Sequence, residues 1–582
     1  LTGVVPNVQT STGAIVGDFG WGPADERTLI SDEAGLVRVH SAPTTSNTVD
    51  FHSAAYFLRY SNSLYVTRVV DANAKNAFAE NDGLPSTQSA VQYKNLDAYQ
   101  TASFTADTAA DSANTGSPFI AKYPGDLGNS IRVSIADNST TFNTWTYKSS
   151  FDRAPGSSQY VKDIVGADSD MGDEIHIAVI DRDGKISGTP NTVLETFPHV
   201  SVATNARGVD GTSIYYRDVL ERQSSYVFGT GAWRYAVGDS DGASGNSSDI
   251  NGPLWDTAAT PSQSGDFQAH GAGVTQWDFD GGANSTSIGT SDLASGYDLY
   301  EDKDNIQIDF LIAPESADAA TATTVVNDLI AIAEARKDCV AVASPDRAAC
   351  VSTPTTSDVT TTTDTYTKST YAVIDNNYLK VFDKYNDQYI KIPAASSTAG
   401  VMAATDLVAA PWFSPAGSRR GNYLGVTDIT FQPTKTDRDT LYKAGVNPIA
   451  NIPGEGIILF GDKTNASRPT AFDRINVRRL FLAIERAIET AAKNVMFEFN
   501  DEFTRAEFVN IVEPFLREVQ GRRGITDFRV VCDETNNPAA IVDANEFVAS
   551  IFVKPARSVN YVTLNFVAVR TGVDFEEVTG TV

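Results

Sequence analysis

The sequence predicts a protein of several domains in the α/β and α+β classes. The chain has 582 residues, and a usual size of about 150 residues per domain gives roughly three or four domains. Strand and helix patterns alternate near the start, short strand-like runs follow, and the last part combines strong helix patterns with long strands. We therefore expect a discontinuous N-terminal α/β domain, a β-rich inserted domain and a C-terminal mixed α/β core domain.

The α/β domain is indicated by apolar runs that flank helix-like segments. Residues 1–13 are uncharged and rich in small and β-branched types, which favours an extended arm before the first strand. Strands are predicted over 14–20 and 64–70, with a helix over 51–60 between them. Strands over 306–314 and 339–346 enclose an amphipathic helix, and a right-handed crossover would make these two strands parallel.

The middle of the chain has a different pattern. Short alternating runs with turn residues predict β-structure over 98–205, and Gly, Ser, Asp and Asn dominate an exposed excursion over 237–296. Residues 353–370 hold ten threonines, so we expect an edge strand or an exposed ribbon there.

The C-terminal part has the clearest helix signals. Thr470 and Asp473 predict the start of one helix, and Thr504 with Glu507 predicts a capping box at the start of a second, which Gly521 ends. Three strands follow, ITDFRVV, FVASIFV and VNYVTLNFVAV. Both alternating faces of the last are largely apolar, which is typical of a strand covered on both sides.

Charge separates two regions of the chain. The net charge is −28, which disfavours nucleic acid and anionic lipid as direct partners. From Asp406 to the end there are 20 basic and 23 acidic residues, whereas the preceding part has 25 and 50. No apolar run is long enough for membrane insertion, and the first thirty residues show no signal-peptide pattern.

We find no set of residues that predicts a catalytic, metal or cofactor site. The five histidines show no H-x-H or H-E-x-x-H spacing, which argues against zinc. The stretch from Gly456 to Thr464 departs from a phosphate loop, because Asp462 stands where lysine should follow the second glycine. A buried strand over 457–460 is predicted instead.

Two other polar features have structural interpretations. The Asp-x-Asp-Gly openings at Asp181, Asp239 and Asp278 lack the closing glutamate of a calcium loop, so we expect Asx turns. The three cysteines, Cys339, Cys350 and Cys532, are too few for a disulfide framework and are expected to be reduced and buried. Reduced thiols suit folding in a cytoplasm.

Arginines cluster in the C-terminal part. Arg474 and Arg478 are four residues apart on a predicted helix, beside Arg479, and Arg522 and Arg523 lie in a turn between two glycines. Two interpretations stay open: solvated or internally paired charge, or contact with acidic surfaces of neighbouring copies.

Several long strings resemble the contractile-tail sheath proteins of myovirus-type bacteriophages. Near the start these are GDFGWGPADERTLIS and AAYFLRYSNSLYVTRVV. Later ones include NPIANIPGEGIILFGDKT, RPTAFDRINVRRLFLAIERAIETAAK and FEFNDEFTRAEFVNIVEPFLREVQGRRGITDFRVVCDETNN. The resemblance covers about seventy residues at the front and about 170 at the back, while the region 98–305 matches the family only as a variable, outward-facing insertion.

The resemblance implies a structural, non-enzymatic subunit of a six-fold helical sheath around an inner tail tube. It implies contraction triggered by the baseplate, which drives the tube through the host envelope. Further implied partners are the tail tube, baseplate and tail terminator proteins, with assembly in the host cytoplasm and a final place in the virion.

The resemblance also refines the domain ranges. It implies an N-terminal arm at 1–20 and a C-terminal arm at 571–582, both of which add strands to neighbouring subunits, and a C-terminal core domain that lies against the tube. The remaining predicted ranges are 21–97 with 206–400 for the α/β domain, 98–205 for the outer insertion and 401–570 for the core. Candidate inter-subunit or tube contacts are Val4, Val5, Val8, Arg474, Arg478, Arg479, Arg522, Arg523, Val573 and Phe575.

Three other functions remain open on the sequence alone. One is the sheath of a phage-derived contractile injection system without a genome. Another is an acidic secreted adhesin, suggested by the Thr- and Gly-rich middle, and the third is a glycan hydrolase with a carboxylate pair in the β-rich insertion.

Overall fold

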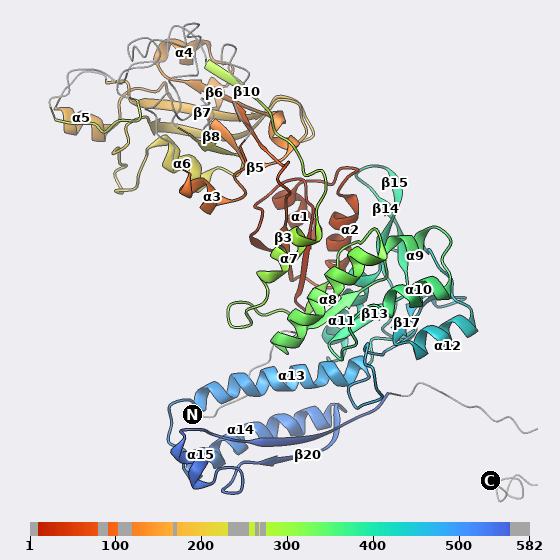
Figure 1. The fold of residues 1–582 in the computed structure, drawn as a ribbon. Helices are drawn as coiled ribbons and strands as arrows, with labels where there is room; N and C mark the ends of the chain where they lie inside the picture. The colour runs from red at the N-terminus through yellow and green to blue at the C-terminus, as the bar shows by residue number, and fades with distance from the viewer. Residues whose placement is uncertain are drawn as a thin grey trace, which may run out of the picture. The chain divides into compact units, whose positions relative to one another are not determined.

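The computed structural model describes residues 10–79, 91–102, 119–166, 171–230, 255–261, 267 and 275–558 (Figure 1). The chain divides into two compact units. The larger unit comprises Gln9–Val408 and Pro415–Pro469, and the C-terminal unit is described over Ala409–Ser414 and 470–558. The predicted mixed α/β architecture with several sheets is confirmed.

The first sheet of the larger unit has seven strands in the order β17-β13-β12-β11-β1-β3-β2. All neighbours are parallel except β2, which runs antiparallel to β3. The strands are β1 (Gly13–Gly17), β2 (Arg27–Ile30), β3 (Leu64–Arg68), β11 (Phe310–Ile312), β12 (Val340–Ala343), β13 (Ala372–Asp375) and β17 (Val446–Asn447). The predicted parallel pairing across the 306–346 crossover is therefore confirmed.

Helices cover both faces of this sheet, because its strands are apolar on both sides. One face packs with α7 and α8, whose Tyr297 and Leu329 share a hydrophobic cluster with Val16. The other face packs with α2 and α11, and Phe57 lies against Phe310 there. The helices of this layer are α1 (Glu33–His40), α2 (Thr48–Phe57), α7 (Thr290–Asp298), α8 (Ala319–Arg336), α9 (Arg347–Val351), α10 (Thr356–Thr363), α11 (Ala395–Val408) and α12 (Lys435–Lys443).

Strand β1 also limits the predicted N-terminal arm. Its five residues are all buried in the centre of the sheet, so the assigned range 1–20 is too long. An arm can only comprise the residues before Gly13.

The second sheet is antiparallel, with the order β8-β7-β6-β10-β4-β5-β9. Its strands are β4 (Asn76–Ala79), β5 (Phe119–Pro124), β6 (Ile131–Ala136), β7 (Glu174–Asp181), β8 (Thr192–Ser201), β9 (Val227–Gly229) and β10 (Thr275–Asp280). Four of these strands lie within 98–205, but β4, β9 and β10 lie outside it, so the sheet extends beyond that range. Its helices are α3 (Leu96–Thr101), α4 (Ser139–Thr144), α5 (Gln159–Val165) and α6 (Tyr216–Gln223).

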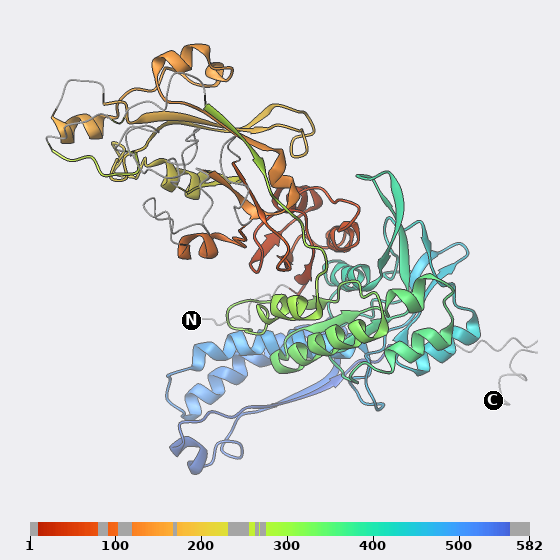
Figure 2. The same ribbon diagram turned by 45° about the horizontal axis from the view of Figure 1, so that its top comes forward.

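Two smaller sheets complete the larger unit. One has the order β15-β14-β16, with β14 (Tyr378–Asp383), β15 (Gln388–Pro393) and β16 (Asp428–Ile429), and the β14–β15 hairpin projects from the unit (Figure 2). The other pairs β18 (Ile449–Ile452) with β19 (Gly456–Leu459). Strand β19 confirms the strand interpretation of the glycine-flanked stretch, although Phe460 is 48% exposed.

The threonine-rich segment is a helix, so the predicted edge strand is wrong. Thr355 caps α10 through a capping box with Asp358, and Val359, Thr362 and Thr363 are buried. The hydroxyl of Thr362 donates to Asp346 over 2.7 Å. The local cap and these tertiary contacts outweigh the weak extended preference of threonine.

The C-terminal unit contains α13 (Ile475–Ala492), η4 (Lys493–Val495), α14 (Glu502–Gly521), β20 (Ile525–Val531), α15 (Ala539–Asp543) and β21 (Ser550–Pro555). Both predicted helices and two of the three predicted strands are present. The third strand, VNYVTLNFVAV, lies outside the described residues. Among the helices of the described residues, none combines the length and apolar composition needed to cross a bilayer.

The predicted starts of both helices are wrong. Helix α13 begins after Arg474, whose side chain makes no capping hydrogen bond, and Thr470 with Asp473 forms a preceding turn instead. Asp501 caps α14 by accepting the Thr504 N–H over 2.8 Å. An aspartate three residues earlier therefore takes the place expected for Thr504.

Candidate functional site

The β20–β21 hairpin is the central feature of the C-terminal unit. One of its faces, including Ile525, Phe528 and Val553, packs into a hydrophobic cluster with α13 and α14. The opposite face exposes Arg529 and Phe552, which lie directly across the two strands from each other. Within the described residues no further strand pairs with either outer edge. The unpaired N–H and C=O groups of such edges can accept an added strand.

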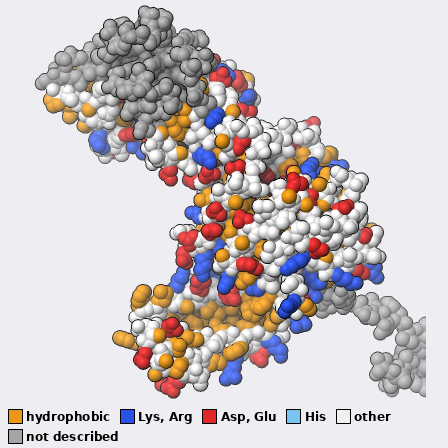
Figure 3. Space-filling view, viewed as in Figure 1, with side chains coloured by type: hydrophobic (Ala, Val, Ile, Leu, Met, Phe, Trp, Pro, Cys, Tyr) orange, Lys and Arg blue, Asp and Glu red, His pale blue; other side chains and the backbone are white. Residues whose placement is uncertain are grey.

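A second apolar feature is the segment 496–503, which follows η4 and ends in the first two residues of α14. Phe497, Phe499 and Phe503 are 100%, 83% and 76% exposed, and Met496 is exposed beside them. Figure 3 shows hydrophobic side chains gathered over this unit, including a hollow between α13 and β20. Exposed apolar surface of this extent marks interaction sites. Sequence reasoning missed this segment. The signal that could have revealed it is that its aromatic residues do not follow the spacing of an amphipathic helix.

The arginines of α13 are not an exposed basic face. Arg478 and Arg479 are 6% and 5% exposed. The guanidinium carbon of Arg478 lies 4.1 Å from the centre of the Phe472 ring, an arrangement that stabilises by cation–π attraction. The Nε atom of Arg474 lies 3.5 Å from Oδ1 of Asp473. Packing within the unit, which was one of the two interpretations left open, accounts for much of this cluster.

The Gly-Arg-Arg-Gly turn after α14 is held by Trp412. The indole N–H donates to the Arg522 carbonyl oxygen over 3.1 Å, and the Arg522 guanidinium lies 5.1 Å from the indole and donates to the Ala409 carbonyl oxygen. A side chain at Gly524 would force its neighbours to shift, because a Cβ there would lie 2.8 Å from Val519 and 3.0 Å from Trp412. Arg523 is left exposed at the turn, with a φ of 67°. The remaining candidates, Val4, Val5, Val8, Val573 and Phe575, lie outside the described residues.

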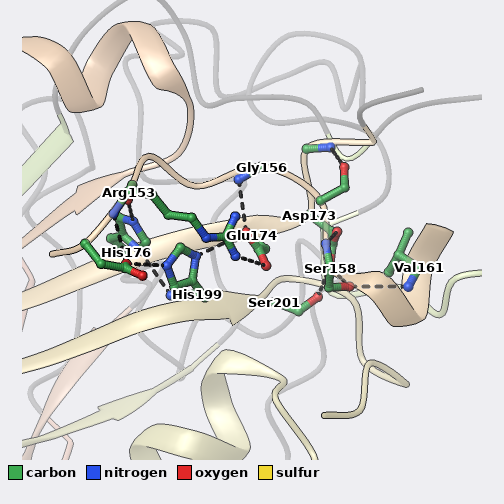
Figure 4. A network of polar contacts seen from close by, with 12 residues as sticks. Arg153, Gly156, Ser158, Val161, Asp173, Glu174, His176, His199 and Ser201 are labelled. Carbon is green, nitrogen blue, oxygen red and sulfur yellow. Dashed lines mark hydrogen bonds and ion pairs between the residues drawn. The ribbon is translucent and has the colours of Figure 1, made fainter. Parts of the chain in front are cut away.

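The second sheet holds a pair of histidines, His176 and His199, within a network of polar contacts (Figure 4). The Nδ1 atom of His176 accepts the His199 N–H over 3.0 Å, and its Nε2 lies 2.8 Å from the Arg153 carbonyl oxygen, to which it donates. Burial lowers the pKa of His176, in keeping with a neutral ring. The two ring nitrogens of His199 contact Glu174 and Asp152.

Two neighbouring serines also form their hydrogen bonds inside the fold. The hydroxyls of Ser158 and Ser201 both donate to the Asp173 carboxylate, over 2.7 and 2.6 Å. His176 binds backbone atoms rather than a hydroxyl, so within the described residues it does not act as the base of a nucleophilic serine. These contacts fasten the 152–158 loop to β7 and β8.

The aspartates singled out by sequence have structural roles. Asp181 accepts the backbone N–H groups of Gly184, Ile186 and Ser187, which confirms an Asx-type turn there. Asp278 lies on β10 and binds Arg132 in a bidentate pair, so the predicted turn at this position is wrong. Asp239 lies outside the described residues. Among those the structure describes, no group of three or more His, Cys, Asp or Glu is placed to hold a metal ion.

The carboxyl edge of the first sheet, where α/β proteins often bind ligands, is filled by buried carboxyl groups. Asp50 accepts the Asp18 N–H over 2.8 Å, and burial raises the pKa of Asp50 to about 7 and that of Asp18 to about 6. Burial likewise raises the pKa of Asp375 to about 7, while Thr398 donates a hydrogen bond to it. Sequence reasoning missed this feature, because its members are distant in the chain.

Open hairpin edges and exposed aromatic surface, on a multidomain α/β scaffold, define a class of protein built to associate with other chains. Comparison with known proteins identifies the family within this class. The family models for the phage tail sheath protein central domain and the phage tail sheath C-terminal domain match residues 294–465 and 467–568.

Full-length relatives extend this match to the whole chain. The tail sheath protein of Enterobacteria phage T4 is 31% identical over 99% of this chain and 97% of its own length. That of Vibrio phage KVP40 is 30% identical over 100% and 98%. The crystal structure of the sheath tail protein Lin1278 from Listeria innocua has a similar fold, with a TM-score of 0.51, 12% identity, and coverage of 94% of this chain and 96% of that one.

The chain therefore belongs to the phage tail sheath protein family. It is a structural, non-enzymatic subunit of a contractile tail sheath and a component of the virion tail. The resemblance expected from the sequence strings is confirmed. The alignment also extends through the middle region, for which the sequence strings gave no match.

Proposed function

We propose that the protein polymerises as stacked six-fold rings around an inner tail tube. A signal from the baseplate then triggers contraction, which drives the tube through the host envelope. The tail tube, baseplate and tail terminator proteins are its proposed partners. Family membership supports this assembly, and the open β20–β21 hairpin supports the way in which copies are joined.

The observation that supports strand exchange most directly is the β20–β21 hairpin, neither outer edge of which pairs with a further strand among residues 275–558 or the other described ranges. The residues before Gly13 are uncharged and rich in β-branched types, and the last residues follow β21 in the chain. Each added backbone hydrogen bond contributes about 0.5–1.5 kcal/mol net. A donated strand with several of them would keep subunits linked while other contacts change.

Charge supports the proposed radial order. The part of the chain before Asp406 carries twice as many acidic as basic residues, whereas the remainder is close to neutral. We place the second sheet outside, where negative charge keeps polymers apart in solution. The C-terminal unit would lie inside, with Arg522, Arg523 and Arg474 as contacts to the tube or to neighbouring copies.

Deletion of each arm tests this proposal. One variant lacks residues 1–9, which leaves β1 intact, and a second lacks 571–582. Matched controls replace each segment by Gly and Ser residues of equal number, and thermal unfolding checks that the units remain folded. We expect electron microscopy to show tubes for the full chain and only short or disordered assemblies for the four variants. Normal tubes from both deletions would contradict the strand-exchange proposal.

A further inference from the structure

His199 lies at an irregular point of strand β8. The pairing of β7 with β8 shifts by one residue there, so that His176 of β7 faces both Pro198 and His199. The backbone of His199 has a φ of 52°, which lies in the left-handed region that side chains seldom occupy. Bulges of this kind redirect a side chain, and backbone strain persists where surrounding contacts hold it. The fold therefore fixes the direction of the His199 ring.

The redirected ring lies between two carboxylate groups (Figure 4). Its Nε2 atom is 2.8 Å from Oδ1 of Asp152, and its Nδ1 atom is 3.2 Å from Oε2 of Glu174. The hydrogen bond from His199 lowers the pKa of Asp152 below its ordinary value. A neutral imidazole has one N–H donor, whereas a protonated imidazole has two. Both contacts are therefore hydrogen bonds only when His199 is protonated.

The other groups around this ring do not change that requirement. His176 is neutral, because its Nδ1 accepts the His199 N–H while its Nε2 donates to the Arg153 carbonyl oxygen. The Arg153 guanidinium lies 3.5 Å from Oε1 of Glu174. Helix α4 and the start of the 152–158 loop contribute aromatic rings beside His176. Among the described residues, the charged groups at this point are thus two carboxylates and one guanidinium.

We propose that His199 is a pH-sensitive clasp for the start of the 152–158 loop. When protonated, the ring joins Asp152 of the loop to Glu174 of the sheet. When it loses a proton, the remaining N–H stays with Glu174, because a buried carboxylate without a donor costs more than an exposed one. The side chain of Glu174 is 6% exposed and that of Asp152 is 74% exposed. The start of the loop is released as the pH rises through the range in which histidine titrates.

The two ends of the loop can be followed separately. At the start, the Arg153 N–H donates over 2.9 Å to the same Asp152 oxygen that faces His199. At the far end, the Ser158 N–H donates to Asp173 over 2.8 Å, with no histidine involved. Exchange of a backbone N–H with deuterium reports local opening. The Ser158 N–H is therefore an internal reference for the Arg153 N–H.

Hydrogen exchange of the full chain provides the test, measured by mass spectrometry with fragmentation to single residues at pH 6.0 and pH 8.5. Observed rates are divided by the rates of an unstructured peptide at the same pH. The variants are Asp152→Asn and His199→Asn, since asparagine tolerates a positive φ and does not titrate. The control is Asp163→Asn, at an exposed position of α5 in the same sheet region.

In the unaltered protein we expect protection of the Arg153 N–H to fall about threefold from pH 6.0 to pH 8.5, the scale of an exposed ion pair. Protection of the Ser158 N–H should change much less. Both variants should show low protection of the Arg153 N–H at both pH values while the Ser158 N–H stays protected, which shows that they are folded. The control should behave as the unaltered protein. Equal protection of the Arg153 N–H at the two pH values, or a fall that persists in His199→Asn, would overturn the inference.

Discussion

Individual buried charges distinguish the larger unit from a simple apolar core. Arg68 is 1% exposed and donates to the carbonyl oxygens of Gly22 and Pro124, over 2.9 and 2.7 Å. It lies at the end of a central strand and ties loops from two parts of the unit to it. Asp71, just beyond, accepts backbone N–H groups of Thr286 and Ser287. Partial burial would raise the pKa of Asp71, but these hydrogen bonds outweigh it and lower the pKa.

Substitution of Arg68 should be strongly destabilising. Arg68→Met removes both charge-assisted hydrogen bonds and leaves two buried carbonyl oxygens unpaired, so we expect a loss of about 2–4 kcal/mol in the free energy of unfolding. Arg59→Met, at an exposed arginine, is the control. Chemical denaturation of both proteins measures the difference, and equal stability would show that Arg68 has no anchoring role.

Asp50 should make the larger unit less stable as the pH rises. Its pKa is raised by burial to about 7, so the folded protein holds the proton more tightly than the unfolded chain, whose carboxyl titrates near 4. The stabilisation is complete below about pH 4 and is lost as pH rises through about 7, on the order of 3–4 kcal/mol in all.

We therefore expect Asp50→Asn, which resembles the protonated form, to reduce the loss of stability between pH 5 and pH 8. Asp97→Asn, at an exposed position, serves as the reference. Denaturation midpoints at the two pH values make the comparison. A pH dependence identical in Asp50→Asn and the unaltered protein would refute the role of this carboxyl group.

At the scale of elements, the sequence predicts periodic segments well and their ends poorly. Apolar spacing predicts the helices α8, α13 and α14 and the parallel strands β11 and β12. Each of these helices buries one apolar stripe, and each of these strands buries both of its faces. Helix α10 could not be predicted from its threonines, since its buried side and its contact with Asp346 depend on distant residues. The arginines of α13 were placed on the correct helix, but their burial against Phe472 is a tertiary property.

The start of α14 offers a test of one such correction. Asp501 caps the helix, so Asp501→Ala should lower the thermal unfolding midpoint of the C-terminal unit. Glu507→Ala, which would remove the capping box predicted from sequence, changes an exposed residue within the helix and should have a much smaller effect. Circular dichroism melting compares the two variants, and a larger loss from Glu507→Ala would restore the original assignment.

At the scale of the whole molecule, family membership was predictable because long strings in the first and last parts resemble sheath proteins. The surfaces that we propose to join copies were harder to predict from the sequence. The open hairpin edges and the exposed phenylalanines emerge only when α13, α14 and β20–β21 are folded together. The surfaces proposed for assembly therefore lie in a nearly neutral part of the chain, and most of the net charge of −28 belongs to the part before it.

The measurement that tests this account most directly is electron microscopy of the purified full-length protein, with image averaging of any polymer. We predict hollow tubes of uniform diameter with six-fold symmetry. In their averaged density, the β20–β21 hairpin of each copy should be extended by strands from neighbouring copies. Monomers at all concentrations, or tubes in which the edges of the β20–β21 hairpin remain unpaired, would contradict this account.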